Sequence, residues 1–386
     1  MSGTAPDSPD TSPIFRPLSI RSLELKNRLV MSPMTRSHSP NGVPGADVAD
    51  YYRKRAEGGT GLLITEGVTI DHPAAVENPS VPHMFGDEAL AGWRRVTDDV
   101  HAAGGKIIPQ LWHVGPLWGA MGRPDPAIKP MRPSGLWGTP GVTSYPEKLV
   151  ARYSPATEPM TAQDIDDVLS AYVRSARNAV DAGFDGIAIH GGHGYLLDAF
   201  MWADTNRRTD EWGGSLAARA AFPAAVVAAI RAEIGDELPI FYRFSQHKQQ
   251  DYKARIADTP EELKVLLGTL VDAGADVLDA SIRRFDAPVF DGDPCSLAGW
   301  AKRLTGARTM AVGSFGLGKT LREGRSAGTI PSEDNREELH RRLTDEEFDL
   351  IAVGRLHLAD PDLAQHLYEG GPLPEFDRDK HERVLH

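Results

Sequence analysis

The sequence predicts a single-domain α/β protein, a (β/α)₈ barrel of the TIM type with a long loop after its third strand. Eight short β-rich runs alternate with longer helical segments, and several of the runs are almost continuously apolar. Strands buried on both faces of a parallel sheet have this composition. No change in composition divides the 386 residues, although such a length allows about two or three domains. The predicted strands cover residues 28–31, 61–65, 106–111, 186–190, 239–244, 277–280, 309–313 and 350–354.

Helix signals lie between these strands. Thr161 and Asp164 have the spacing of a capping box, and Thr259 precedes a proline and two glutamates, a pattern typical of a helix start. Gly183 and Gly274 follow the periodic apolar residues of these two segments, and glycine there ends a helix. Eight strand–helix units in series favour one closed barrel over two open sheets.

Three segments fall outside this alternation. Residues 1–13 are rich in acidic residues, proline and serine and predict a disordered tail, which leaves 14–386 as the barrel domain. Residues 116–159 contain nine prolines and follow the third strand. Loops of this length are usually functional or disordered, so we expect a cover over the C-terminal end of the barrel. Residues 322–335 are polar and predict a mobile surface loop.

Charge and composition exclude several classes of partner. Lys and Arg number 42 against 54 Asp and Glu, a net charge of −12, which argues against nucleic acid and anionic membranes. No apolar run is long enough to span a bilayer, and the first residues lack the pattern of a secretion signal. Cys295 is the one cysteine, so neither a disulfide framework nor a four-thiolate cluster is expected. We predict a soluble, cytoplasmic protein.

Residues at the C-terminal ends of barrel strands build the site in this fold. The seventh and eighth predicted strands end in Gly313-Ser314 and Gly354-Arg355. Backbone amides at such glycines and an arginine fork suit a phosphate group, although tight turns would give the same residues. The other polar or glycine-containing strand ends are Pro33-Met34-Thr35, Glu66-Gly67, Gln110 with Trp112, His190 with His193 and Tyr195, and Arg243.

The cluster HGGHGY at residues 190–195 has three interpretations. His190 and His193 have the spacing of half a zinc site, but no third ligand pattern flanks them, and no metal is predicted. They are alternatively packed structural histidines. The interpretation we prefer is that both donate hydrogen bonds to a substrate oxygen while Tyr195 delivers a proton.

Residues 313–320 (GSFGLGKT) match the P-loop pattern literally. A phosphohydrolase using Lys319 needs a helix directly after this loop. Residues 321–328 (LREGRSAG) form a poor helix, and a chance match is credible in a chain with 38 glycines. A barrel kept only as a binding or scaffold protein is a further alternative.

Seven segments of the chain, which contain most of the strand-end residues described above, resemble the old yellow enzyme family of FMN-dependent ene-reductases. The resemblance spans residues 14–370 in the expected order, with Trp212 in place of the usual tyrosine. The matching segments are NRLVMSPMTR (27–36), LLITEG (62–67), IIPQLWHVG (107–115), IHGGHGYLLDAF (189–200), NRRTDEWGGSLAAR (206–219), VGSFG (312–316) and FDLIAVGRLHLADPDL (348–363).

The resemblance implies a tightly bound, non-covalent FMN. Pro33, Met34 and Thr35 would lie along the isoalloxazine ring, Gly67 and Gln110 would contact its pyrimidine edge, and Arg243 would lie near N1 and O2. The phosphate would be held by residues at the last two strand ends, which are Gly313, Ser314, Gly354 and Arg355.

The resemblance also implies the chemistry. NADPH or NADH would reduce FMN, and flavin N5 would pass a hydride to Cβ of an α,β-unsaturated carbonyl compound such as an enone or enal. His190 and His193 would bind the carbonyl oxygen, Tyr195 would protonate Cα, and Trp112 would line the pocket. Reduction of nitro compounds or nitrate esters, and oxidation by a desaturase, stay as alternatives. The sequence leaves open a monomer or a homodimer.

Three departures from the family pattern matter. Thr35 stands where one branch has a redox-tuning cysteine, and the single cysteine excludes relatives with an iron–sulfur cluster. The tail after Pro372 lacks the tyrosine-containing stretch that forms the far pocket wall in many members. Residues 244–255 (FSQHKQQDYKAR) also differ from the usual loop, and we expect the long loop at 116–159 to replace part of the wall.

Overall fold

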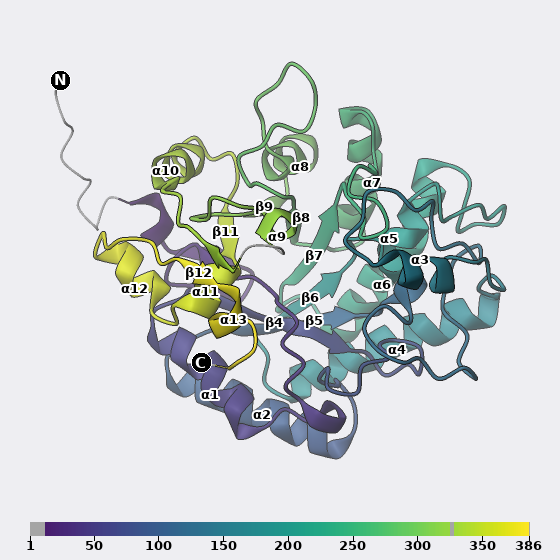
Figure 1. The fold of residues 1–386 in the computed structure, drawn as a ribbon, viewed down its shortest axis with the longest axis horizontal. Coiled ribbons are helices and arrows are strands. Elements are labelled where there is room, and N and C mark those ends of the chain that lie inside the picture. Colours follow the sequence, from purple (N-terminus) through teal and green to yellow (C-terminus); the bar gives the residue numbers. More distant parts are fainter. Residues whose placement is uncertain (1–11, 325–327, 386) are drawn as a thin grey trace.

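The computed structural model describes residues 12–324 and 328–385. Eight parallel strands close into a barrel in the order β11-β3-β4-β5-β6-β7-β8-β9, surrounded by helices (Figure 1), which confirms the predicted (β/α)₈ fold. All eight predicted strands are present. Their bounds are β3 Leu29–Met31, β4 Leu62–Thr69, β5 Ile107–Trp112, β6 Ile187–His190, β7 Ile240–Ser245, β8 Val277–Ser281, β9 Arg308–Val312 and β11 Leu350–Val353.

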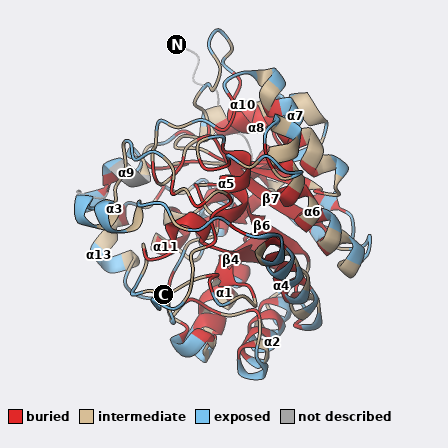
Figure 2. Cartoon of the chain, turned by 90° about the vertical axis from the view of Figure 1, so that its right-hand side faces the viewer, coloured by how far each residue is buried: buried red, intermediate tan, exposed pale blue. Residues whose placement is uncertain are grey.

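The helices bury one face against the strands and expose the other, as Figure 2 shows by colour. None of the helices in the described ranges is long and apolar enough to cross a membrane. The main outer helices are α1 Ala46–Glu57, α2 Asp87–Ala102, α4 Ala162–Asp181, α6 Leu216–Ile234, α7 Pro260–Asp272, α8 Leu297–Thr305, α10 Arg336–Thr344 and α12 Leu363–Tyr368. The short helices α5 Leu196–Met201 and α11 Arg355–Ala359 follow the C-terminal ends of β6 and β11.

Local signals set the ends of these helices as predicted. The Thr161 hydroxyl accepts from the Asp164 amide and the Asp164 carboxylate accepts from the Thr161 amide, a complete capping box on α4. The Thr259 hydroxyl caps α7 through the Glu262 amide. Gly183 (φ +89°) follows α4 in the left-handed region that glycine adopts without strain.

The barrel interior is filled with apolar side chains at its N-terminal end. A hairpin of β1 (Leu18–Ile20) and β2 (Leu23–Leu25) packs against inward-facing residues of the barrel strands, including Val30 and Phe241. The Ser22 amide at the hairpin turn donates to the Glu237 carbonyl, just before β7 begins. The hairpin thus closes this end of the barrel and leaves the C-terminal ends of the strands for the site.

The long loop after β5 is ordered and contains the helix α3 (Glu147–Tyr153). Trp137 is buried at its centre. The loop lies against the segment that follows β7, since the Gly141 amide donates to the Gln250 carbonyl and the Tyr252 amide donates to the Val142 carbonyl. The two unusual segments of the sequence, one rich in proline and the other in glutamine and lysine, therefore support each other.

Two predictions about flexible segments change. Residues 322–335 were expected to form a mobile loop, but β10 (Thr329–Ile330) pairs with β12 (Phe376–Asp377) near the C-terminus, and Ile330 is buried. That prediction is wrong for β10, because its partner strand is remote in sequence; residues 325–327 lie outside the described residues. Residues 1–11 of the predicted tail 1–13 also lie outside them, whereas Ser12 is buried and its hydroxyl pairs with His340 at 3.1 Å.

Candidate active site

Two adjoining cavities, both open to solvent, lie at the C-terminal ends of the strands. They share four lining residues, Met34, His193, Gln249 and Arg355. Every site residue predicted from the sequence lines one or both of them. The first cavity contains Met34, His193, Gly313, Ser314, Gly354 and Arg355, and the second contains Pro33, Met34, Thr35, Gly67, Gln110, Trp112, His190, His193, Tyr195, Arg243 and Arg355.

Gly67 and Gln110 are register partners on β4 and β5. A Cβ at Gly67 would lie 2.4 Å from the Trp112 ring, so glycine is needed for the indole to pack across this strand. The Gln110 amide nitrogen is buried and has no hydrogen-bond partner within the described ranges. A buried donor of this kind fits a ligand that supplies a carbonyl oxygen, such as the pyrimidine edge of a flavin.

Arg243 lies at the centre of the barrel mouth and is held by two neighbours. Its Nε donates to the Asp279 carboxylate at 2.7 Å and one terminal nitrogen approaches the Ser32 hydroxyl at 3.3 Å. Burial raises the pKa of Asp279, while the guanidinium beside it opposes that rise. Asp279 was missed from the sequence, although it is the one charged residue in the run VLDAS.

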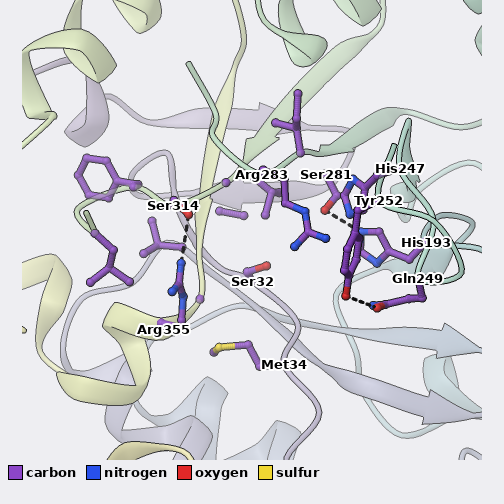
Figure 3. A pocket seen from close by; sticks show the side chains of 18 residues that line it. Ser32, Met34, His193, His247, Gln249, Tyr252, Ser281, Arg283, Ser314 and Arg355 are labelled. Atoms are coloured by element: carbon purple, nitrogen blue, oxygen red, sulfur yellow. Dashed lines mark hydrogen bonds between the residues drawn. The ribbon is translucent and has the colours of Figure 1, made fainter. Parts of the chain in front are cut away.

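The first cavity has a positively charged end, where Arg355 lies between β9 and β11. Arg355 donates to the Ser314 hydroxyl at 3.1 Å (Figure 3). It also donates to the Lys319 carbonyl at 3.0 Å. Its other terminal nitrogen is buried without a hydrogen-bond partner in the described part of the chain. Burial lowers the pKa of Arg355 to about 10, which still leaves the guanidinium charged at neutral pH. A Cβ at Gly313 would lie 2.6 Å from the Ile282 carbonyl oxygen, so this close approach needs glycine.

The P-loop alternative does not fit this arrangement. Lys319 is exposed and lines neither cavity. The helix after it, α9 (Leu321–Gly324), has only four residues, whereas a P-loop needs a helix whose N-terminus cradles the phosphates.

Three rings from the end of β6 converge on the second cavity. The His190 and Tyr195 ring centroids are 4.8 Å apart, and those of His190 and His193 are 5.1 Å apart, with the rings nearly perpendicular in both pairs. Trp112 meets Tyr195 edge-on at 5.0 Å. The two imidazoles and the phenol thus border one small volume.

Burial lowers the pKa of His190 well below its usual value, and the Arg243 cation lowers it further. Burial does the same to the pKa of His193, with His247 and His190 adding to the effect. Both rings are therefore neutral at pH 7. His190 Nδ1 accepts from the Gly192 amide at 3.4 Å, which places the ring proton on Nε2 as a donor. His193 Nε2 pairs with the Ser281 hydroxyl at 2.9 Å.

The far wall of the second cavity comes from the C-terminus. Arg378 and Glu382 line it and form an ion pair at 2.6 Å at α13 (Arg378–His381). Arg36 fixes this segment by donating to the carbonyls of His381 and Val384. The expectation that residues 116–159 would replace part of the wall is wrong, because none of them lines either of these two cavities.

The long loop instead supports a second group of lining residues that the sequence did not identify. The Thr143 hydroxyl donates to the Gln249 carbonyl at 2.6 Å. Gln249 belongs to the segment after β7, and His247 and Tyr252 of that segment also line the first cavity, opposite Arg355 in Figure 3.

Comparison with known proteins agrees with this geometry. The family model described as "NADH:flavin oxidoreductase / NADH oxidase family" matches residues 13–373. Flavin oxidoreductase hxnT of Emericella nidulans is 31% identical over 95% of this chain and 93% of its own. 12-Oxophytodienoate reductase 1 of Oryza sativa subsp. japonica is 30% identical over 95% and 88%.

Solved structures give the same answer. Morphinone reductase superposes with a TM-score of 0.77 at 28% identity, over 96% of this chain and 93% of that one. The chain therefore belongs to the NADH:flavin oxidoreductase / NADH oxidase family, the old yellow enzyme family.

Proposed function

We propose that this protein is an FMN-dependent ene-reductase, which uses NADPH or NADH to reduce the activated C=C bond of α,β-unsaturated carbonyl compounds. The observation that carries the proposal is the convergence of two neutral imidazoles and a phenol on one cavity that also contains Gln110 and Arg243. Neutral imidazoles donate hydrogen bonds to a carbonyl oxygen without delivering a full charge.

The names of the relatives support the class of reaction. Two are called 12-oxophytodienoate reductase 1 and morphinone reductase, and a structure of the latter is described as a complex with tetrahydroNAD. These names support a nicotinamide as electron donor and an unsaturated ketone as acceptor for this chain.

The residues present fit FMN. Arg355, Ser314 and the backbone at Gly313 and Gly354 would hold the phosphate, and Gln110 with its buried, unmatched donor would meet the ring edge. Arg243 would balance the negative charge of a reduced ring. Bound FMN supplies hydride chemistry that no amino-acid side chain provides.

The protein's own groups then act on the acceptor. His190 and His193 would donate to the carbonyl oxygen and stabilise the negative charge that develops there, as in an oxyanion hole. Tyr195 would transfer its phenolic proton to Cα. The edge-on contact with Trp112 restrains the Tyr195 ring and would help to hold its hydroxyl toward the acceptor.

A second acceptor class uses the same donors. Nitro groups and nitrate esters present oxygens that His190 and His193 would bind equally well, so these reactions, and the reverse desaturation, are tested alongside enones. Cytoplasmic location and the choice between monomer and homodimer stay predictions from the sequence.

The decisive experiment is a spectrum of the purified protein followed by anaerobic rapid mixing. We expect a flavin spectrum, bleaching by NADPH or NADH, and reoxidation by a panel of enones and enals. A colourless protein that FMN does not reconstitute would overturn the proposal. Reoxidation by nitro compounds but by no enone would replace the proposed substrate class with the second one.

A further inference from the structure

A buried ion pair lies directly behind the proposed substrate-binding residues. Lys248 Nζ contacts the Asp198 carboxylate at 2.6 Å, and both side chains are fully inaccessible to solvent. Lys248 belongs to the segment after β7, which contributes His247 and Gln249 to the first cavity, and Asp198 belongs to α5, the helix that directly follows Tyr195. Neither residue lines a cavity itself.

The pair connects to the backbone between His193 and Gly194. The second Asp198 carboxylate oxygen accepts from the Gly194 amide at 2.6 Å. In the segment after β7, the Gln249 amide donates to the His193 carbonyl at 3.0 Å, and Lys248 forms an isolated parallel bridge with His193. The ion pair and the peptide that follows Lys248 therefore hold the one peptide unit that joins His193 to Gly194.

This stretch of backbone needs such support. His193 has φ +63°, a left-handed conformation that is unfavourable for a residue with a Cβ, and Gly194 follows at φ +82°. Strained residues of this kind persist only where the surroundings fix them. Ser245 adds a further restraint, because its hydroxyl accepts from the His193 amide at 2.8 Å.

We infer that Lys248 and Asp198 are positioning residues that set the directions of His193 and Tyr195 toward the acceptor. This inference rests on the proposed function of His193 and Tyr195. It adds to that function by naming the residues that fix the orientation of these two side chains. The charges themselves matter, because the fully buried ammonium needs its carboxylate partner, and a neutral pair would lack the attraction that holds the Lys248 segment against α5.

The test compares the paired variant Lys248→Met/Asp198→Asn with the wild-type holoenzyme. In this variant the side-chain amide at position 198 still accepts a hydrogen bond from the Gly194 amide. Because both replaced side chains are neutral, no unpaired charge is buried and we expect the variant to fold. A single substitution, in contrast, would leave one buried charge without its partner. The matched control is Arg342→Met/Glu347→Gln, which removes a 2.6 Å pair between α10 and the segment that follows it, outside both cavities.

Three readouts separate positioning from a structural role. The first readout uses phenol as a probe that would stack on bound FMN between His190 and His193 and give a charge-transfer band. We expect its dissociation constant to rise roughly 10–100-fold in the paired variant, since small misplacements of binding groups cost about that much. The FMN dissociation constant and the melting temperature should stay close to those of the control. In ¹⁵N-histidine spectra of the ligand-free holoenzyme, the His193 signals should shift or broaden.

Unchanged phenol affinity together with unchanged His193 signals would overturn the inference, and so would an equal loss of FMN affinity in both variants. The histidine spectra need no substrate. A wild-type enzyme that reduces no enone would therefore count against the proposed function, whereas the spectra would still decide whether the ion pair positions His193.

Discussion

Arg243 and Asp279 are cross-strand partners on β7 and β8, and the guanidinium Nε donates to the carboxylate at 2.7 Å. Both side chains are almost completely buried, at 5% and 1% exposure. The register of two parallel strands therefore places a compensated cation at the barrel mouth. Asp279 orients the guanidinium of Arg243, and the remaining N–H donors of Arg243 face Ser32 and the second cavity.

Replacing Asp279 by asparagine should destabilise the protein strongly, because Arg243 would keep its charge in a buried site without a counter-ion. We expect a loss of roughly 3–5 kcal/mol in the free energy of unfolding, measured by urea denaturation. The control is Asp345→Asn, whose pair with Arg341 is more than half exposed and should contribute at most about 1 kcal/mol. Equal losses in the two variants would contradict the prediction.

Tyr195→Phe should separate the two half-reactions. The phenolic proton is needed only when the acceptor is reduced, so we expect that step to slow by about 10²–10⁴-fold. Reduction of the flavin by NADPH or NADH should change little, since a phenylalanine ring at this position would keep the contacts with Trp112 and His190. Anaerobic stopped-flow measures both rates, with Tyr368→Phe on α12 as control. An equal loss in both steps would exclude Tyr195 as the proton donor.

The barrel and most of the lining of the second cavity could be predicted because their signals are local. Each strand is a short apolar run whose C-terminal end carries the polar or glycine residue, as at His190 and Arg243. Parallel strands bring those ends together whatever the loops do. The position of each strand end in the sequence therefore determined its position in the site.

The parts that escaped prediction depend on contacts between remote segments. Lys248 and Asp198 come into contact only because β7 lies beside β6, and the sequence around either residue does not indicate which residue it pairs with. The far wall forms because Arg36 fixes the C-terminal segment more than 340 positions away. Proline content correctly indicated an unusual loop at 116–159, but composition does not say which loop lines a cavity and which one supports it.

Arg355→Ala should weaken FMN far more than riboflavin. Only FMN carries the phosphate that we expect beside Arg355 and Ser314. A charge-assisted hydrogen bond contributes roughly 1.5–3 kcal/mol, or about 10–100-fold in the dissociation constant. Flavin-fluorescence titration of the apoprotein measures both affinities. Arg355→Lys keeps the charge without the planar fork and should lie in between. Equal weakening of both flavins would place the phosphate elsewhere.

Glu66 should make stability depend on pH with a defined sign. Its carboxylate accepts from the Arg36 and Ser37 amides, and burial raises its pKa from 4.5 to about 7. Between these two pH values the folded state holds a proton that the unfolded chain releases. The contribution of Glu66 to the free energy of unfolding is therefore complete below pH 4.5 and is lost as the pH rises through 7. A tenfold change in proton affinity is worth about 1.4 kcal/mol, so the loss approaches roughly 3 kcal/mol. Urea denaturation from about pH 4.5 to 8 should show Glu66→Gln gaining stability relative to wild type by about that amount, whereas the exposed control Glu337→Gln should run parallel to wild type.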